Sequence, residues 1–309
     1  MILVVHVNPA IDRVYAVERL TIGGVARPYA LTANAGGKGS NVSRVARLLG
    51  EEVSVCGFIG GYAGDFVEGE LKKNGIRTAF TRIKGESRSC INIFDKSSRL
   101  STEILEPGPH IASDEQEAFV NRYEALLDRC RLVSASGSLA NGLESDFFNV
   151  LIERAKEKGI PFILDTSGDA LRKSLEAAPY LIKPNTEEIS DYLGTSSASL
   201  ESLVDCLTDF RKGGIRLPVV SMGSKGCLTI IDNEVCHFSH PRLEAKNAVG
   251  SGDSFIAGFS VGLARNLSDT ESIRLGIACG MANTQFFKTG HITTELVEKY
   301  LPLIHYDVV

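Results

Sequence analysis

Short apolar runs alternate with amphipathic segments along most of the chain. Residues 1–7 and 53–59 are rich in Val and Ile and predict buried strands, whereas residues 39–49 carry apolar side chains at helical spacing. Further helices are predicted at residues 115–127, 146–158 and 200–211, further strands at residues 132–135, 161–164, 180–182 and 218–221, and a hairpin at residues 226–238. Strands that alternate with helices predict a mostly parallel central sheet with helices on both faces.

Two segments break this alternation. Residues 14–33 and 89–105 are short strand-like stretches with polar faces, and neither contains a helical pattern of its own. We expect them to form a small extra β-sheet that projects from the main body and acts as a lid. No Pro-, Gly- or charge-rich stretch marks a linker, so residues 1–309 are expected to form one domain with this lid.

Composition narrows the class of protein. Hydrophobic residues make up 43% and charged residues 23% of the 309 positions, which is typical of a soluble globular protein. The net charge is −5 without a basic block, so no nucleic-acid partner is expected. No apolar run is long enough to cross a membrane, and no signal peptide is recognisable. Seven scattered cysteines without a C-x-x-C pair indicate reduced thiols and a cytoplasmic location.

The most informative segment is NAVGSGDSFIAGF at residues 247–259. Gly250, Ser251 and Gly252 lead into a helix whose first backbone N–H groups lack partners, which makes an anion site. Asp253 places a carboxylate beside that site, where it can accept the proton of a hydroxyl that attacks a phosphoryl group. The alternative is that Asp253 only stabilises the first turn of the helix.

A second glycine-rich segment, AGGKGSNVS at residues 35–43, also opens a helix. Gly36 and Gly37 allow the backbone to approach a ligand, Lys38 can pair with a phosphate, and Asn41 can both donate to and accept from sugar hydroxyls. The alternative is a glycine-rich helix entry that carries a solvated lysine.

Asp12 lies in NPAID, directly after the first predicted strand. In a parallel sheet ligands bind beyond the carboxyl ends of the strands, so this carboxylate can hold sugar hydroxyls. The alternative role is that of an Asx-turn residue.

The segment KPNTEE at residues 183–188 follows another strand. Asn185 and Glu188 are three residues apart at a helix start and face the same side. Together they can hold Mg²⁺ through its water shell, because magnesium favours oxygen ligands and retains waters. An N-x-x-E capping box explains the same residues equally well.

These motifs, together with SMGSKG at residues 221–226, occur in an order that resembles the carbohydrate kinases of the ribokinase-like PfkB family. The resemblance covers essentially the whole chain, from residue 8 to residue 290. It implies a ribokinase-like three-layer α/β sandwich with a small β-sheet lid that often also forms a homodimer. It implies ATP and Mg²⁺ as cofactors. Ala248 departs from the family pattern, which usually has Pro, Ser or Thr there, with a small expected effect on the adjacent anion site.

The resemblance also assigns roles to individual positions. Asp253 matches the catalytic base, and Gly250, Ser251 and Gly252 match the anion hole. Asp12, Gly36, Gly37 and Asn41 match the sugar clamp. The nucleotide side comprises Lys183, Asn185, Ser221, Gly223 and Gly226, and Asn185 with Glu188 matches the magnesium-organising pair.

One branch of the family is favoured by NPAID, the pair Ser87-Arg88, SGSL at residues 136–139 and TEILEPGP at residues 102–109. These stretches look like kinases that phosphorylate ketohexose monophosphates. The branch implies four partners for the phosphate already on the sugar: Arg27, Lys38, Arg88 and Ser136. Arginine suits a bidentate grip on phosphate. For Arg27 and Arg88 the alternative is a solvent-facing position on the lid.

The expected reaction is therefore ATP-dependent phosphorylation of a ketohexose monophosphate to a bisphosphate. SRSCINI at residues 87–93 and the following ILEPGP favour tagatose 6-phosphate as the substrate, whereas IGGVAR at residues 22–27 favours fructose 1-phosphate. A kinase of nucleosides or other small molecules and a catalytically silent sugar-phosphate binding protein are more distant alternatives. Lys38 and Arg88 argue against the first of these, because an unphosphorylated substrate needs no second anion pocket, and Asp253 beside an intact GSG argues against the second.

Overall fold

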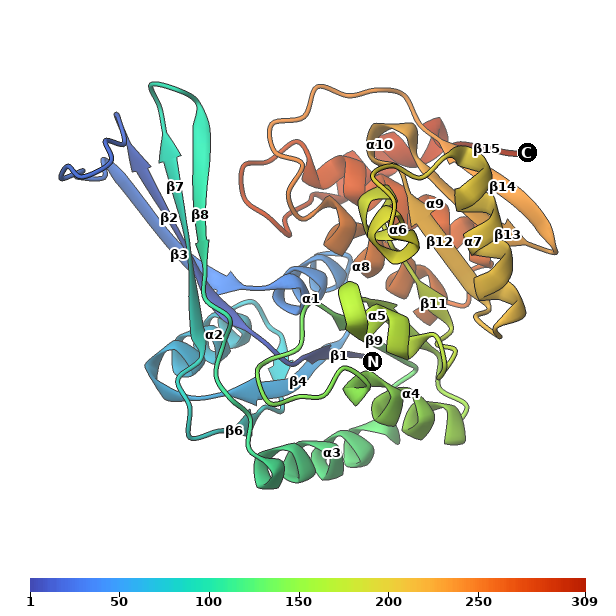
Figure 1. Cartoon of the computed structure of the whole chain (residues 1–309), viewed down its shortest axis with the longest axis horizontal. Coiled ribbons are helices and arrows are strands. Elements are labelled where there is room, and N and C mark those ends of the chain that lie inside the picture. The colour runs from blue at the N-terminus through green and yellow to red at the C-terminus, as the bar shows by residue number, and fades with distance from the viewer.

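A large twisted sheet forms the centre of the protein, as the computed structural model of all 309 residues shows (Figure 1). Strand β1 (Ile2–His6) pairs in parallel with β4 (Val53–Ile59) on one side and β9 (Leu132–Ser136) on the other. The parallel order continues through β10 (Phe162–Asp165), β11 (Leu181–Ile182) and β12 (Leu217–Ser221).

Both edges of the large sheet are made of shorter or antiparallel strands. Strands β5 (Arg77–Thr78) and β6 (Thr81–Arg82) pair with β4. The predicted hairpin is present as β13 (Cys227–Ile231) and β14 (Glu234–Ser239), and the C-terminal strand β15 (His305–Val308) adds to it. The predicted mostly parallel sheet with an antiparallel edge is thereby confirmed, although β15 was not predicted.

Helices cover both faces of this sheet, and the alternation along β1 explains why. Ile2 and Val4 join the buried cluster beneath one helical layer, whereas Leu3 and Val5 join the cluster beneath the other. The first layer comprises α1 (Lys38–Leu48), α2 (Gly61–Lys73), α8 (Ser251–Ala264), α9 (Asp269–Asn283) and α10 (Thr294–Tyr300). The second comprises α3 (Ser113–Leu127), α4 (Phe147–Glu157), α5 (Gly168–Ser174), α6 (Thr186–Leu193) and α7 (Leu200–Lys212).

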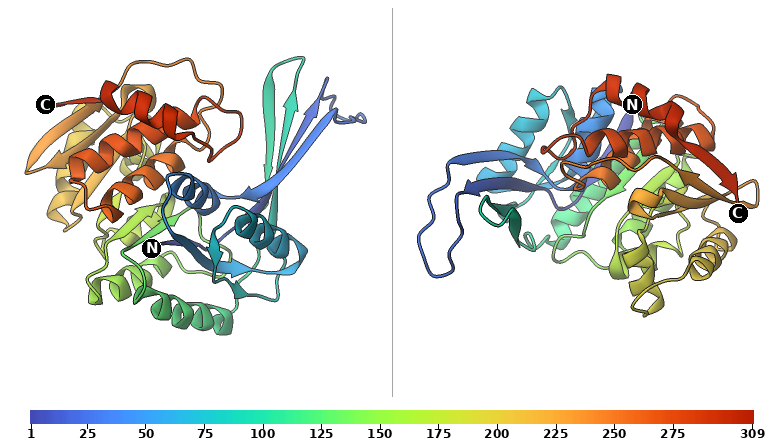
Figure 2. Two further views of the ribbon diagram at one scale, coloured as in Figure 1. Left: turned by 180° about the vertical axis from the view of Figure 1, so that it is seen from behind. Right: turned by 90° about the horizontal axis from the view of Figure 1, so that it is seen from above.

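A second sheet of four strands projects from this body, as Figures 1 and 2 show. Its order is β3 (Ala30–Gly36), β2 (Ala10–Val17), β7 (Arg88–Asp95) and β8 (Leu100–Leu105), so both segments predicted as an extra sheet contribute to it. The two central strands, β2 and β7, are parallel. The sheet begins four residues earlier than the predicted start at residue 14, since β2 begins at Ala10.

The large and small sheets meet where β1 passes into β2. Asp12 and Gly36 therefore lie on paired strands near the root of the small sheet rather than at its tip. Apolar side chains are exposed along the small sheet, among them Val14, Leu31 and Ile104. No helix of the protein is long and apolar enough to cross a membrane.

Candidate active site

The start of α8 forms a backbone anion site. Gly250 caps the helix in the left-handed region, with a φ of 82° that glycine adopts without strain. The hydroxyl of Ser251 donates to the carbonyl of Ala248 at 2.6 Å, which fixes the turn before the helix. The N–H groups of Gly252 and Asp253 have no acceptor within the chain. They lie at the N-terminus of α8, the positive end of the helix dipole, and can therefore donate to a bound anion.

Asp253 is buried in the first turn of α8, with 7% of its surface exposed. Its Oδ2 accepts a hydrogen bond of 2.7 Å from Nδ2 of Asn41 on α1, while Oδ1 makes no hydrogen bond to the protein. Burial raises the pKa of Asp253 to about 6, and the nearby Asp165 carboxylate adds to this rise. The hydrogen bond from Asn41 and the charges of the nearby lysines act in the opposite direction. A carboxylate with this pKa is largely ionised near neutral pH and accepts a proton readily.

Two lysines converge on Asp165, which ends β10. Nζ of Lys38 lies 3.2 Å from one Asp165 oxygen, and Nζ of Lys183 lies 3.3 Å from the other. Burial alone would raise the pKa of Asp165, but the two ammonium groups hold it below its usual value. Lys183 is itself buried, and a Cβ at Gly252 would lie 3.3 Å from its Nζ. Positive charge is thus fixed directly beside the anion site of α8.

Asn185 and Glu188 form a capping box, which the sequence pattern allowed as the alternative to a magnesium site. The backbone N–H of Asn185 donates to Glu188 Oε2, and the N–H of Glu188 donates to Asn185 Oδ1, each at 2.8 Å. The second carboxylate oxygen of Glu188 has no hydrogen-bond partner, and its charge contributes to the raised pKa of Lys38. No three His, Cys, Asp or Glu side chains gather at a metal-binding distance. A capping box and a water-mediated contact to magnesium are therefore compatible here.

The nucleotide-side residues predicted from separate motifs lie next to one another. The N–H of Ser221 donates to the carbonyl of Pro184 at 2.9 Å. Ser221 and Asn185 form an isolated parallel β-bridge beyond the ends of β11 and β12. The following turn contains Gly223 and Gly226, both with positive φ. The ends of β11 and β12 therefore bring the two motifs together at the same edge as β10 and α8.

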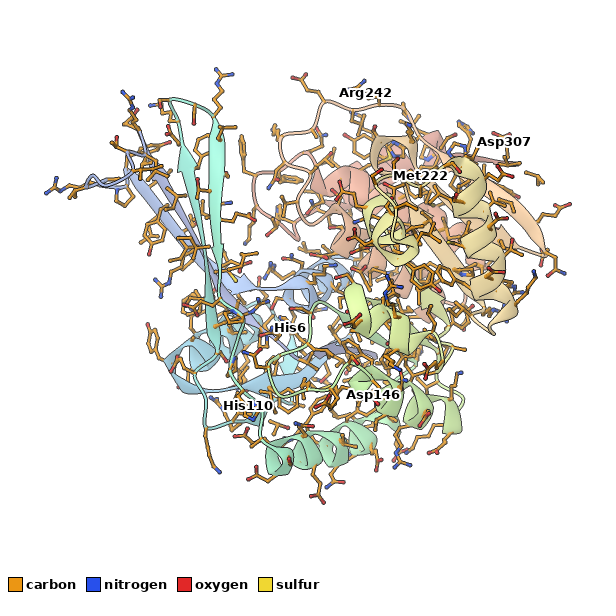
Figure 3. All side chains as sticks on the ribbon, in the orientation of Figure 1. His6, His110, Asp146, Met222, Arg242 and Asp307 are labelled. Carbon is orange, nitrogen blue, oxygen red and sulfur yellow. The ribbon has the colours of Figure 1, made fainter.

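The sugar-side residues gather at the root of the small sheet. A Cβ at Gly36 would lie only 2.0 Å from Cγ of Asp12, so the paired strands fit Asp12 only because position 36 lacks a side chain. Burial raises the pKa of Asp12, while a hydrogen bond from the Gly37 backbone lowers it. His6 supports this loop from below through a 3.0 Å contact between Nε2 and the Gly36 carbonyl, and Figure 3 shows His6 at the base of the small sheet.

The four predicted phosphate partners are not all brought together. Ser136 is buried at the end of β9 with an unpartnered hydroxyl, and a Cβ at the next residue, Gly137, would lie 3.8 Å from the Cβ of Lys38. Arg88 donates from Nε to the carbonyl of Asn8 at 3.2 Å and from a terminal nitrogen to that of Glu106 at 3.0 Å. Arg27 is exposed in the loop between β2 and β3. The two extended strands carry that loop away from the body, so within one chain Arg27 does not join the others (Figure 1).

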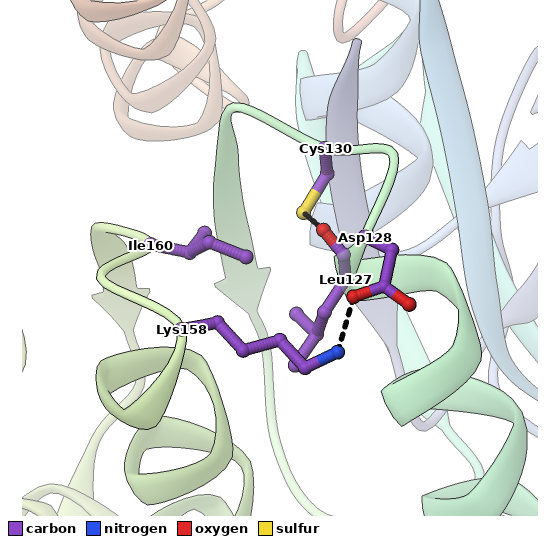
Figure 4. A pocket seen from close by; sticks show the side chains of 5 residues that line it. All are labelled: Leu127, Asp128, Cys130, Lys158 and Ile160. Carbon is purple, nitrogen blue, oxygen red and sulfur yellow. Dashed lines mark hydrogen bonds and ion pairs between the residues drawn. The ribbon is translucent and has the colours of Figure 1, made fainter.

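Two surface hollows lie outside the cluster around Asp253. One, of about 450 Å³, is lined by Leu127, Asp128, Cys130, Lys158 and Ile160 near the ends of α3 and α4, and an ion pair between Lys158 and Asp128 crosses it (Figure 4). The other, of about 380 Å³, lies beside Arg88 and residues 106–110. Neither is lined by residues of the anion site at the start of α8.

Three buried polar residues of this region were not predicted. Asp165 stands at the carboxyl end of a strand, a position that could have identified it. Arg44 lies on the buried side of α1 and bonds to Asn41. Asn283 donates to the Val249 carbonyl at 2.9 Å and accepts from the Gly290 N–H at 2.9 Å, which ties the turn before α8 to the end of α9. An asparagine inside the apolar stretch IACGMAN is the only sequence signal for it.

A buried carboxylate thus lies beside a helix N-terminus and two fixed lysines, at the carboxyl edge of a three-layer α/β sandwich, where such groups can receive an anion and accept a proton. The chain belongs to the pfkB family of carbohydrate kinases, whose profile matches residues 1–295. It is a sugar-phosphate kinase with a ribokinase-like fold, as the sequence motifs implied.

Solved structures agree with this assignment over nearly the full length. A Thermotoga maritima protein named as a possible 1-phosphofructokinase is 26% identical, with a TM-score of 0.90 over 100% of this chain and 99% of that one. Escherichia coli phosphofructokinase-2 is 25% identical, with a TM-score of 0.90 over 97% of this chain and 98% of that one. Arabidopsis thaliana ribokinase, solved with ribose and ATP, shares the fold at 22% identity and a TM-score of 0.76, over 97% of this chain and 98% of that one.

Proposed function

We propose that this kinase transfers the γ-phosphoryl group of ATP to a hydroxyl of a ketohexose monophosphate and so produces a ketohexose bisphosphate. The observation that carries the proposal is the position of Asp253. Its free Oδ1 lies beside the unpartnered N–H groups of the α8 N-terminus, and Lys38 and Lys183 supply positive charge at the same edge.

In the proposed mechanism Asp253 accepts the proton of the attacking hydroxyl. The anion hole at Gly250, Ser251 and Gly252 receives the transferring phosphoryl group, and the unpartnered N–H groups of Gly252 and Asp253 stabilise its negative charge. Lys183 holds charge beside that group, because its ammonium lies close to Gly252. The remaining task of the site is to hold the two substrates in line, which accounts for a large part of the rate enhancement in phosphoryl transfer.

The sugar and its existing phosphate are proposed to bind at the root of the small sheet. Asp12, Gly36, Gly37 and Asn41 clamp the hydroxyls, and Lys38, Arg88 and Ser136 hold the phosphate. The unpartnered Ser136 hydroxyl supports this assignment, since a buried donor without an acceptor favours a ligand.

We also propose that residues 1–309 act as one kinase domain with the small sheet as its lid, and that the lid pairs with a second copy of the chain. The exposed apolar side chains of the small sheet support a homodimer. The related E. coli phosphofructokinase-2 has been solved in a tetrameric inhibited form. A second copy would also allow Arg27, which lies at the far end of its own lid, to reach a substrate phosphate.

ATP is proposed to bind along the edge formed by Lys183, Asn185, Ser221, Gly223 and Gly226. The site fits magnesium held mainly by waters and nucleotide phosphates, because Glu188 offers one free carboxylate oxygen beside Asn185. Bound magnesium would neutralise charge on the phosphates. The chain's own contribution is to orient that ion's water shell through Asn185 and Glu188.

Two substrates remain candidates. The lid motif around Cys90 favours tagatose 6-phosphate, whereas IGGVAR and the Thermotoga neighbour favour fructose 1-phosphate. The experiment is ADP release with tagatose 6-phosphate, fructose 1-phosphate and fructose 6-phosphate, compared by kcat/KM at equal magnesium. A preference for either of the first two decides between them. Turnover of a nucleoside but of none of the three would refute the proposal, and binding without turnover would favour a silent binding protein.

A further inference from the structure

We propose that Arg44 is a positioning residue for phosphoryl transfer: its buried guanidinium fixes the side-chain amide of Asn41 so that Nδ2 holds the carboxylate of Asp253. The proposal rests on the proposed function, in which Asp253 is the base. It assigns a task to a residue that is not itself one of the proposed sugar, phosphate or nucleotide contacts, although it bonds to Asn41 of the sugar clamp.

Arg44 is an unusual buried cation. Only 7% of its surface is exposed, and no carboxylate forms an ion pair with it. Instead its terminal nitrogens donate to the carbonyl of Ala35 at 2.6 Å and to Oδ1 of Asn41, with a longer contact of 3.5 Å to the carbonyl of Thr289. A buried charge without an ionic partner carries a large desolvation cost. Packing alone would be served better by an apolar side chain, so the charge itself needs an explanation.

The bond to Asn41 provides that explanation. An arginine has only donors, so the amide must turn its oxygen toward Arg44, which leaves its nitrogen facing Asp253. One oxygen of the Asp253 carboxylate is then held, and the other remains free for the substrate hydroxyl. Because Arg44 and Asn41 are three residues apart on α1, the helix itself sets their relative position.

The arrangement also acts on the charge of the base. Asp253 faces a like charge on Asp165 and opposite charges on Lys38 and Lys183, with Arg44 behind Asn41. Burial raises the pKa of Asp253, and the hydrogen bond from Asn41 lowers it. Because Arg44 fixes the Asn41 amide, its Nδ2 keeps donating to Asp253 and so favours the ionised carboxylate near neutral pH.

Arg44→Met tests the proposal, with Arg47→Met, an exposed arginine of the same helix, as the matched control. We expect Arg44→Met to lower kcat by about tenfold at pH 7, because the base loses its fixed donor. Asn41 also belongs to the proposed sugar clamp, so the KM for the sugar phosphate should rise, but by no more than about threefold. The acid limb of the kcat profile should move up by about half a pH unit to one unit. Arg44→Lys should restore most of the shift of the acid limb but not all of kcat, because a single ammonium nitrogen does not reproduce the two separate nitrogens that contact Ala35 and Asn41.

A double-mutant cycle separates positioning from packing. If Arg44 acts through Asn41, Arg44→Met in an Asn41→Leu background should cost little further kcat. Full additivity, or a loss of kcat without movement of the acid limb, would show a structural role only and overturn the proposal. Should Arg44→Met fail to fold, Arg44→Gln and Arg44→Lys carry the same comparison.

The role of Arg44 can also be tested without measuring catalytic turnover, and therefore independently of the proposed kinase activity. The carboxyl ¹³C resonance that disappears in Asp253→Asn reports the ionisation of Asp253 directly. It should titrate at higher pH in Arg44→Met than in the wild type, and an unchanged titration refutes the role of Arg44. A wild type that turns over no sugar phosphate refutes the proposed function, whatever the titration shows.

Discussion

Replacing the buried carboxylate of Asp253 should stabilise the protein while it abolishes catalysis. The folded state raises the pKa of this group from the ordinary value of 3.8 to about 6. Each pH unit corresponds to about 1.4 kcal/mol, so the ionised carboxylate costs the folded state about 3 kcal/mol above pH 6. Asn removes the charge but keeps an oxygen that can accept from Asn41. We therefore expect the free energy of unfolding of Asp253→Asn to exceed that of the wild type by about 3 kcal/mol at pH 8.

The sign and pH window of this effect follow from linkage. Between pH 3.8 and about 6 the folded state binds the proton more tightly than the unfolded state, so wild-type stability falls as the pH rises through this range. The difference in unfolding free energy between Asp253→Asn and the wild type should accordingly vanish near pH 4 and reach its full value above pH 7. Urea unfolding at pH 4, 6 and 8 measures it, with the exposed Asp209→Asn on α7 as the control.

Activity supplies the second half of the test. Asp253→Asn should lose at least about a thousandfold in kcat if the carboxylate is the base, while sugar-phosphate binding is kept. A variant no more stable than the wild type at pH 8 would show that the carboxylate is not strained by its burial. Near-full activity of the variant would refute its role as base.

Three further predictions concern other parts of the site. Asp165→Asn should lower the free energy of unfolding by about 3 kcal/mol in urea titrations, because it leaves a buried lysine unpaired; equal stability would show that water replaces the pair. Gly36→Ala should reduce kcat/KM for the sugar phosphate by about tenfold or more with little change in the KM for ATP, because its Cβ displaces the Asp12 carboxylate; equal effects on both substrates would contradict this. Glu188→Gln keeps the capping acceptor, so thermal stability should hold while the magnesium concentration for half-maximal rate rises several-fold; an unchanged magnesium dependence would remove Glu188 from the metal's surroundings.

Sequence patterns predicted those parts of the molecule that depend on local order along the chain. The strands of the central sheet, most of its helices and the small sheet follow from periodicity of 2 and 3.6 residues. The glycine-rich turns are recognisable because they combine unusual backbone freedom with polar side chains at helix starts. The capping box and the magnesium-organising pair use the same two residues, Asn185 and Glu188, so a pattern alone could not choose between them, and the geometry accommodates both.

Contacts between distant segments were the part that patterns missed. The bond that joins Asn41 to Asp253 spans 212 positions, and the pair of Lys38 with Asp165 spans 127. Nothing in the local sequence marks Arg44 as buried, since arginine in an amphipathic helix normally faces solvent. Conversely, Arg27 lies in a motif that predicts phosphate binding, but two extended strands carry it away from the site.

The link between α1 and α8 bears on how the enzyme acquires its activity during synthesis. The residues of the sugar clamp are translated within the first 41 positions, whereas the base arrives at position 253, after a turn that Asn283 of α9 ties at Val249. A nascent chain that ends before α8 therefore carries a sugar clamp but no base and no anion hole. Catalytic competence therefore depends on the late docking of the C-terminal helices, which brings Asp253 to Asn41, whereas the Lys38–Asp165 pair joins segments that are synthesised earlier.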